Sequence, residues 1–273
     1  MKKLASILIA ATAFMGVATT VSFAEAEKDA KAVAFSFEGP FGKFDKAQLQ
    51  RGYKVYKEVC ANCHAMKFIA FRNLADKGGP GFSEEQVKAL AASFKIHELN
   101  DKGEGVDRAG LASDVFPSPF ATPEAAAAAL GAAPPDLSLI TKAREGWHGT
   151  FNQLVNGIGG PQYVYSLLTG YEKPSAEAAK EAPAGKFYNP YFANGAWISM
   201  PANGNLVDGG VTFDDGAPNK IDDMAKDVSA FLAWTAEPKM EERKQTGLEV
   251  VIYLLILAGL LYAVKRKIWS DIH

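Results

Sequence analysis

Apolar residues recur along much of this chain with the period of an amphipathic helix, which predicts a mainly helical protein. The first such stretch follows Asp45, where Leu49, Tyr53 and Tyr56 are spaced by four and three positions. Asp45 is placed to cap this helix, with Gln48 at its third position. The same spacing continues through Val59, Cys60 and Cys63, so the sequence predicts one helix that begins after Asp45 and carries both cysteines.

Capping residues and apolar periodicity predict further helices. We expect one after Ser83, one from Thr122-Pro123 to Gly131, one that follows Pro134-Pro135 and ends near Arg144, one over residues 163–168, and one that begins after Asn219 and stops before Pro238. Residues 100–119, 146–161, 171–185 and 187–218 lack a helical period and are predicted to form long loops.

Both ends of the chain carry long apolar segments. Lys2 and Lys3 precede an uncharged run that extends to Ala24, which predicts a signal peptide over residues 1–24. Small residues before Glu25 favour cleavage after Ala24, and a retained anchor is the alternative.

Near the C-terminus, residues 248–264 form an apolar run interrupted only by Glu249. As a helix this run spans about 26 Å, close to the thickness of a hydrocarbon layer, so we predict a transmembrane helix. The basic triplet 265–267 that follows predicts a cytoplasmic tail over residues 265–273. Residues 25–247 are then expected to form a periplasmic domain anchored in the inner membrane of a bacterium.

Composition fits one globular domain and one anchor. Of 273 residues, 48% are hydrophobic and 22% are charged. The formal net charge is −2; without the basic start of the signal peptide and the net positive residues 248–273, the exported part carries about −5. Such a charge gives no reason to expect a nucleic acid partner.

The strongest chemical signal is Cys60-Ala61-Asn62-Cys63-His64. Two thiols three positions apart, followed at once by an imidazole, suit covalent attachment of one haem c, with His64 as an iron ligand. A zinc site or a redox dithiol is the alternative. Zinc needs four ligands, and the chain has no further cysteine and only three further histidines, which are His97, His148 and His273.

The second axial ligand is expected in residues 187–218. Met200 lies there, in Trp197-Ile198-Ser199-Met200-Pro201, and a thioether on a proline-containing loop suits a ferrous iron. Met66 is too close to His64, Met224 lies on an apolar helix face, and Met240 lies among charged residues. His97 and His148 remain alternatives, with Met200 then a core residue.

Two further candidate site residues can also be interpreted without a haem. Tyr56 lies one turn before Cys60 and is expected near the porphyrin, although a simple core aromatic has the same spacing. Arg144 can pair with a haem propionate or cap a helix end. Acidic residues that cluster near the last helix of the domain can dock a basic partner, and these are Asp208, Asp214, Asp215, Asp222 and Asp223.

Ordered motifs along nearly the whole mature chain resemble the cytochrome c1 family. They are Arg51-Gly52-Tyr53-Lys54-Val55-Tyr56 before the haem motif, Pro134-Pro135-Asp136-Leu137-Ser138-Leu139-Ile140 with Arg144, Tyr163 to Tyr171, Asn189-Pro190-Tyr191-Phe192, Ile198-Ser199-Met200-Pro201, and Ala236-Glu237-Pro238 before the anchor. The resemblance implies a class I cytochrome c-like haem domain with long loops and one C-terminal transmembrane helix.

On that resemblance, Cys60 and Cys63 hold the haem, His64 and Met200 are axial, Arg144 meets a propionate, and Tyr56, Pro134, Pro135 and Tyr163 line the pocket. The chain lacks the cysteines for a disulfide that some bacterial relatives carry near the methionine. We therefore expect the loop over residues 187–218 to be immobilised by packing alone.

The resemblance also implies a function, which is that of the haem subunit of a ubiquinol:cytochrome c oxidoreductase. Its partners would be cytochrome b, the Rieske iron–sulfur protein and a soluble c-type cytochrome, in a dimeric complex. The chain itself would transfer electrons and have no catalytic residue. A haem enzyme with an open sixth position and a tethered carrier that serves another oxidase are the alternatives.

Overall fold

The computed structural model describes residues 26–100, 102–144, 150–202 and 206–270. The predicted signal peptide and His148 lie outside the described residues.

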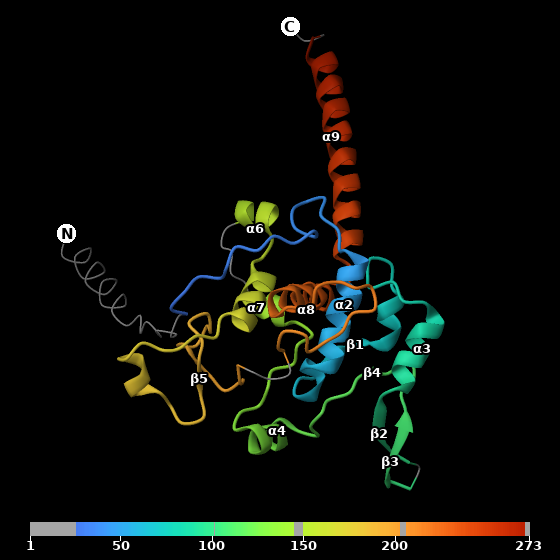
Figure 1. Ribbon diagram of the computed structural model, residues 1–273. Helices are drawn as coiled ribbons and strands as arrows, with labels where there is room; N and C mark the ends of the chain where they lie inside the picture. The colour runs from blue at the N-terminus through green and yellow to red at the C-terminus, as the bar shows by residue number, and fades with distance from the viewer. Residues whose placement is uncertain (1–25, 101, 145–149, 203–205, 271–273) are drawn as a thin grey trace, which may run out of the picture.

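The described chain is mainly helical, with short strands between the helices (Figure 1). The helices are α2 (Lys46–Glu58), α3 (Glu84–Ala92), α4 (Pro123–Leu130), α5 (Ile140–Ala143), α6 (Thr150–Asn156), α7 (Gly160–Thr169), α8 (Ile221–Ala236) and α9 (Met240–Ser270), with single 3-10 turns at Cys60–Asn62, Phe71–Ala75 and Ala178–Glu181. The predicted mainly helical architecture, with long loops and one C-terminal apolar helix, is confirmed.

Helices α2 and α8 form the central crossing of the domain. Gly52 makes it possible, because a Cβ at this position would lie only 2.2 Å from the carbonyl oxygen of Asp227. Beside the crossing, the Arg51 guanidinium donates to the buried Asp227 carboxylate, with Nε 2.7 Å from Oδ2. Burial raises the pKa of Asp227 and outweighs the opposing effect of Arg51. Residues of α2 that flank Gly52 are thus held against α8.

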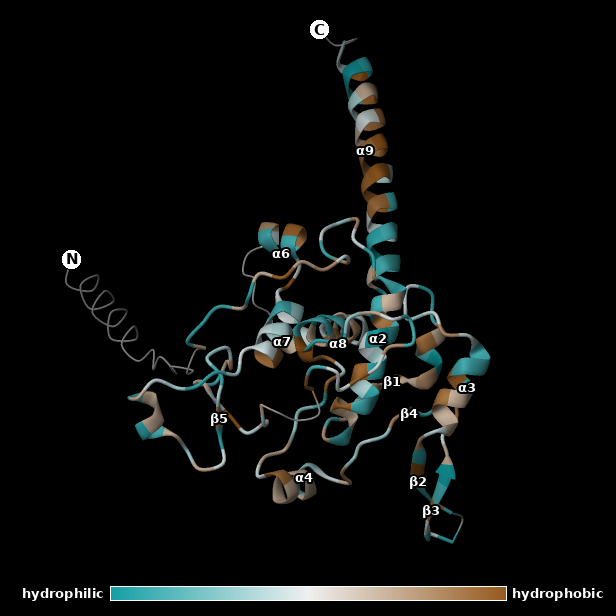
Figure 2. Ribbon diagram, in the orientation of Figure 1, coloured by the Kyte–Doolittle hydropathy of each residue, from teal (hydrophilic) through white to brown (hydrophobic). Residues whose placement is uncertain are grey.

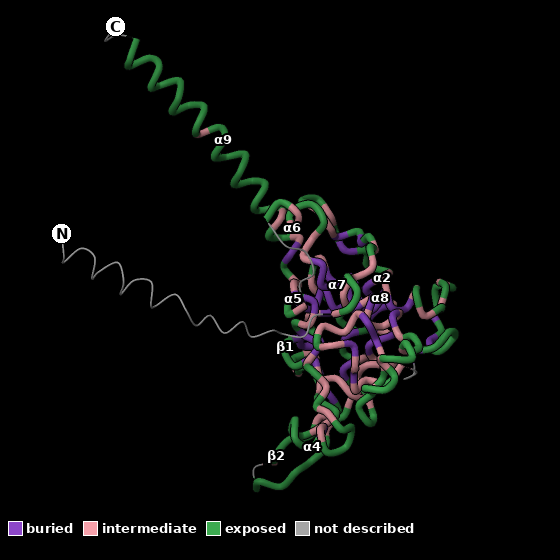
Figure 3. The backbone as a smooth tube through the Cα atoms, turned by 90° about the vertical axis from the view of Figure 1, so that its left-hand side faces the viewer, coloured by how far each residue is buried: buried purple, intermediate pink, exposed green. Residues whose placement is uncertain are grey.

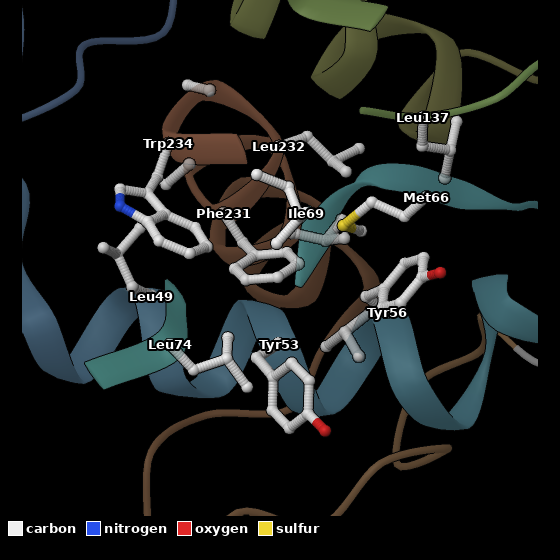
Figure 4. Packing of buried hydrophobic residues seen from close by; sticks show 14 of the residues in the cluster. Leu49, Tyr53, Tyr56, Met66, Ile69, Leu74, Leu137, Phe231, Leu232 and Trp234 are labelled. Carbon is white, nitrogen blue, oxygen red and sulfur yellow. The ribbon is translucent and has the colours of Figure 1, made fainter. Parts of the chain in front are cut away.

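Large apolar side chains fill the core around this crossing (Figure 4). Leu49 and Tyr53 come from α2, and Phe231 and Trp234 come from α8. Fully burying one such side chain contributes about 1.5–3 kcal/mol, so this cluster accounts for much of the stability of the domain. Tyr56, Met66 and Leu137 lie together at one side of it, next to the haem motif.

Three pairs of short antiparallel strands were not predicted from the sequence but are present in the described residues. β1 (Met66–Ala70) pairs with β4 (Val115–Phe116), β2 (Lys95–Leu99) pairs with β3 (Gly105–Ala109), and β5 (Phe187–Tyr188) pairs with β6 (Trp197–Ile198). The β2–β3 hairpin projects from the end of the domain opposite α9 (Figure 1). Its residues are mostly exposed, so it lacks the apolar alternation that identifies a strand in a sequence.

The predicted N-terminal caps are right for the early helices and wrong for α8. Asp45, Ser83 and Thr122 cap α2, α3 and α4 through their side chains. At α8 the N-cap residue is Lys220, and Asn219 donates to the carbonyl of Val211. Asp208 caps the helix instead, since its Oδ1 accepts from the backbone N–H of Ile221 at 2.7 Å.

Helix α9 leaves the domain and projects away from it, exposed along its length (Figure 3). It is the one helix in the described part of the chain that is long and apolar enough to span a membrane. Its first turns are polar and its middle is hydrophobic (Figure 2). Predicted segment 248–264 is therefore the middle of a longer continuous helix, and Met240, expected among charges, is buried at its start.

Hydrogen bonds attach the base of α9 to the domain. Glu241 Oε1 accepts from the backbone N–H of Phe44 at 2.8 Å, and Lys244 Nζ donates to the carbonyls of Phe37 and Gly42 at 2.7 and 3.2 Å. Because α2 begins just after Phe44, it starts beneath α9 and runs away from it toward the haem motif (Figure 1).

Candidate haem site

The Cys60 to His64 motif forms a tight turn at the end of α2. The backbone N–H groups of Cys63 and His64 both donate to the carbonyl of Cys60, at 3.1 and 2.9 Å. Both cysteines are free thiols and half-buried. Burial raises the pKa of Cys60 to about 12, with a further contribution from Cys63. The turn therefore presents two thiols and an imidazole from one short stretch of backbone.

His64 is oriented by a backbone carbonyl. Its Nδ1 lies 2.8 Å from the carbonyl oxygen of Pro135, which accepts the Nδ1 proton. Burial lowers the pKa of His64, although this hydrogen bond opposes the shift. A neutral imidazole with its proton on Nδ1 has a free lone pair on Nε2, which is the form that binds iron. The donor set therefore fits a haem iron.

The chain after Pro135 runs beside the chain after His64. Asp136 accepts from the backbone N–H of Lys67 at 3.0 Å and from that of Ser138 at 2.9 Å. The buried Ser138 hydroxyl accepts from the N–H of Phe68 at 3.1 Å, and Leu137 N–H donates to the carbonyl of Ala65 at 2.9 Å. These bonds fix the position of the Pro135 carbonyl. The sequence analysis quoted Asp136 and Ser138 only as part of a motif and did not predict these supporting contacts.

Tyr56 is a buried aromatic that also contacts the motif. Its ring packs edge-on against Phe116, and its hydroxyl donates to the carbonyl of His64 at 3.4 Å. Burial raises the pKa of Tyr56, so the phenol stays protonated and remains a donor. The interpretation of Tyr56 as a core aromatic is confirmed, and its position near the porphyrin stays a prediction. Pro134 lies directly before Pro135 in the same segment.

Hydrogen bonds hold the segment that leads to Met200, so the expectation of packing alone is wrong. Asn189 is fully buried and its Nδ2 donates to the carbonyl of Leu167 in α7 at 2.7 Å. The Tyr163 hydroxyl accepts from the N–H of Ala193 at 3.4 Å. The Tyr171 hydroxyl donates to the carbonyl of Met200 itself at 3.0 Å. Met200 is half-buried at the end of this braced segment, just beyond β6.

The competing ligand candidates differ in their surroundings. His97 lies exposed in the β2–β3 hairpin, with Nδ1 3.0 Å from Asp107 Oδ1. Met66 and Met224 are fully buried in the core, as predicted for Met224. Within the described ranges, no group of three or more His, Cys, Asp or Glu side chains has an arrangement that could hold a metal ion by itself.

Other predicted site residues have identifiable contacts. Arg144 ends α5 and its Nη1 donates to the carbonyl of Ala143 at 3.1 Å. In the acidic cluster, Asp208 caps α8, Asp214 and Asp215 accept from Lys54 and Arg51, and Asp222 accepts from the Tyr165 hydroxyl. These carboxylates therefore have structural partners within the domain, and their predicted role in docking stays a prediction.

The crossing of α2 and α8 beside a Cys-Ala-Asn-Cys-His turn defines a c-type cytochrome. Comparison with known proteins narrows this class, because a family model described as "Cytochrome C1 family" matches residues 35–272. This chain belongs to the cytochrome c1 family. Its members are haem subunits of the bc1 complex, which places the chain in electron transport and implies a c-type haem.

Similar proteins come from bacteria and plants. A protein named cytochrome c1 from Cereibacter sphaeroides is 44% identical, over 88% of this chain and 87% of the relative. A protein from Arabidopsis thaliana named "Cytochrome c1 1, heme protein, mitochondrial" is 42% identical, over 95% of this chain and 79% of the relative. A protein named cytochrome b/c1 from Bradyrhizobium diazoefficiens is 47% identical over the whole chain, which spans only 41% of that relative.

Proposed function

We propose that this protein carries single electrons from the Rieske iron–sulfur protein to a soluble c-type cytochrome within a dimeric bc1 complex. The observation that supports this most directly is the hydrogen bond from His64 Nδ1 to the Pro135 carbonyl, because it prepares Nε2 for an iron in a chain of the cytochrome c1 family. The haem supplies a one-electron couple when bound. No bond of a substrate is made or broken by this chain, so it has no catalytic residue.

Residues of the chain bind and orient the cofactor. Cys60 and Cys63 would hold a single haem through thioethers, and His64 and Met200 would bind its iron. The bond from Tyr171 to the Met200 carbonyl supports this role, since it braces the backbone that carries the thioether. Arg144 meets a propionate, and Tyr56, Pro134, Pro135 and Tyr163 line the pocket.

The proposed topology follows from the ends of the chain. Residues 1–24 are a cleaved signal peptide, residues 25–247 form the periplasmic domain, residues 248–264 span the inner membrane, and residues 265–273 are cytoplasmic. Because α2 runs away from the base of α9, the haem motif lies at the end of α2 remote from the bilayer. That position suits exchange of electrons with proteins in the periplasm.

Cytochrome b is the proposed membrane partner. One relative bears the name cytochrome b/c1, and this chain spans only 41% of its length. Extraction in mild detergent should therefore recover this protein with cytochrome b and the Rieske protein. Recovery of the chain without them would contradict the bc1 assignment and favour a tethered carrier for another oxidase.

Optical spectra of Met200→Leu test the axial ligand. We expect loss of the weak near-infrared sulfur–iron band of the oxidised protein and a large fall in reduction potential. An unchanged spectrum would favour His97 or His148. Carbon monoxide provides a further test, because rapid binding to the reduced wild-type protein would mean an open sixth position and a haem enzyme. Extraction of the pigment by acid acetone would rule out thioether attachment.

A further inference from the structure

Helix α6 exposes all of its large apolar side chains. Phe151, Leu154 and Val155 are spaced by three and one positions, which puts them on one face, and they are 80%, 57% and 47% exposed. Asn152 and Gln153, between them, are half-buried. A short helix that leaves its three large apolar side chains this exposed is suited to a surface other than water.

Phe41 extends this apolar surface and is 74% exposed. The loop that carries it touches α6, since a Cβ on Gly39 would lie 3.5 Å from the carbonyl oxygen of Val155. On the other side of the contact, a Cβ on Gly157 would lie 3.5 Å from Cγ of Glu38. Phe41, Phe151, Leu154 and Val155 are called the apolar patch below.

The apolar patch lies beside the first turns of α9. Lys244 of α9 donates to the carbonyls of Phe37 and Gly42, which enclose Phe41 in the sequence. Figure 1 shows α6 and this loop on the side of the domain from which α9 projects, and the rotated view in Figure 3 also shows α6 at the foot of α9. The exposed apolar residues of α9 begin at Leu248, one turn beyond Lys244.

We propose that the apolar patch inserts into the outer boundary of the lipid bilayer, between the headgroups and the acyl chains. The proposal rests on the proposed membrane anchorage of α9. Continuity with α9 favours lipid over a protein as the occupant, because the patch meets the membrane wherever α9 enters it. The patch is also small, whereas a stable protein interface uses about 20–30 residues on each side. Exposed aromatic and aliphatic side chains on a short amphipathic helix are typical of interfacial contacts with lipid.

This gives a role to residues 146–161, for which the sequence suggested no chemistry. Insertion of α6 and Phe41 beside α9 would give the domain a second point of contact with the membrane. Two separated contacts fix the tilt of the domain as well as its height above the bilayer, whereas one helix fixes the height alone.

Spin labels on the full-length, haem-loaded protein test the proposal. The thioethers consume Cys60 and Cys63, so a single introduced cysteine is the one site for a nitroxide, and unsubstituted protein should take up no label. Phe151→Cys reports on the patch and Val155→Cys repeats the measurement. Leu99→Cys is the matched water control, since Leu99 is 72% exposed in the hairpin opposite α9. Leu255→Cys, 68% exposed on α9, is the lipid control.

The proteins are placed in nanodiscs of phosphatidylethanolamine and phosphatidylglycerol, and accessibility to oxygen is compared with accessibility to a water-soluble nickel chelate. We expect the oxygen-to-nickel ratio at positions 151 and 155 to exceed that at position 99 several-fold. A ratio equal to that at position 99 would place the patch in water and overturn the proposal. Shielding from both reagents would mean a protein occupant and overturn it too. A water-like ratio at position 255 would instead refute the anchorage by α9.

Discussion

Nδ1 of His64 lies 2.8 Å from the carbonyl oxygen of Pro135, and Asp136 holds that carbonyl in place through bonds to the backbone N–H groups of Lys67 and Ser138. The imidazole of His64 is therefore oriented indirectly: it binds the Pro135 carbonyl, and the side chain of the next residue, Asp136, holds that carbonyl in place. This indirect arrangement can be tested, because Asp136 itself does not touch the imidazole through a hydrogen bond in the described structure.

Asp136→Ala should loosen the segment that carries the Pro135 carbonyl. Two backbone donors lose their acceptor, and we expect the free energy of unfolding to fall by about 1–3 kcal/mol. Thermal unfolding followed by haem absorbance measures the loss. Ser138→Ala, which removes a single bond to the Phe68 N–H, is the matched control and should cost less. Equal stability of Asp136→Ala and the wild type would mean that the Pro135 carbonyl needs no support.

Tyr171→Phe should weaken the hold on Met200 without changing either axial ligand. The variant removes the phenol that donates to the Met200 carbonyl at 3.0 Å, a bond worth about 0.5–1.5 kcal/mol. We expect a weaker near-infrared sulfur–iron band and a lower reduction potential, both measured by spectroelectrochemistry. Tyr165→Phe, which removes a bond to Asp222 on the surface, should leave both unchanged. Identical effects of the two variants would argue against a specific role for Tyr171.

Gly52→Ala should destabilise the crossing of α2 and α8. The added methyl would meet the Asp227 carbonyl oxygen at 2.2 Å and Phe231 Cβ at 2.6 Å, so one helix must move. Overpacking of this kind costs about 1–3 kcal/mol. The midpoint of unfolding in denaturant measures it. Gly247→Ala adds the same methyl in α9 with nothing within 4 Å, and it should not lower stability. A neutral Gly52→Ala would show that the two helices can separate freely.

Acid stability should depend on Asp114. Its two carboxylate oxygens accept from the Arg108 guanidinium at 2.6 and 3.0 Å, and Oδ2 also accepts from the Leu111 N–H. The Arg108 bonds, followed by the Leu111 bond, hold the pKa of Asp114 below its ordinary 3.8. The folded state thus favours the charged form. This contribution to stability is complete above about pH 4 and is lost as the pH falls through the lowered pKa.

Asp114→Asn isolates that contribution. The difference in unfolding free energy between the wild type and the variant should be constant at neutral pH and shrink as the solution is acidified below about pH 4. Denaturant titrations at a series of pH values measure it. A difference that grows on acidification would have the wrong sign and would contradict the assignment of the Arg108 pair.

Lys244→Met should loosen the loop beneath α9. The substitution keeps the length of the side chain and removes the donors to the Phe37 and Gly42 carbonyls. We expect the free energy of local opening over residues 37–44 to fall by about 1–3 kcal/mol, as measured by amide hydrogen exchange. Lys239→Met is the control, since Lys239 pairs only one turn away with Glu242 and is largely exposed. Unchanged exchange at residues 37–44 would mean that packing alone holds this loop.

Local signals predicted the parts of the fold that local interactions determine. Asp45, Ser83 and Thr122 cap the helices that follow them, because each cap contacts a backbone N–H three residues later. The cap of α8 could not be found this way, since Asp208 and Ile221 are 13 residues apart. The mostly exposed β2–β3 hairpin and the short helix α6 carried no recognisable apolar period against a buried face.

The same distinction applies to the candidate site. Cys60, Cys63 and His64 belong to one contiguous motif, so the sequence alone was enough to predict their chemistry. The resemblance to the cytochrome c1 family pointed to Pro135 but gave no reason for it. That reason is a carbonyl that meets an imidazole 71 residues away, which only the folded chain reveals. Asn189 and Tyr171 brace the segment that leads to Met200 in the same non-local way.

The hydrogen bonds from Glu241 and Lys244 to the loop between Phe37 and Phe44 affect how the domain can move relative to the membrane. They tie the foot of α9 to the loop that leads into α2, so they restrict bending of the domain about the base of α9. A redox centre at the far end of α2 would then stay at a nearly constant height above the lipid. The electron donor and the electron acceptor would then each have to move to the haem, because this domain would not move between them.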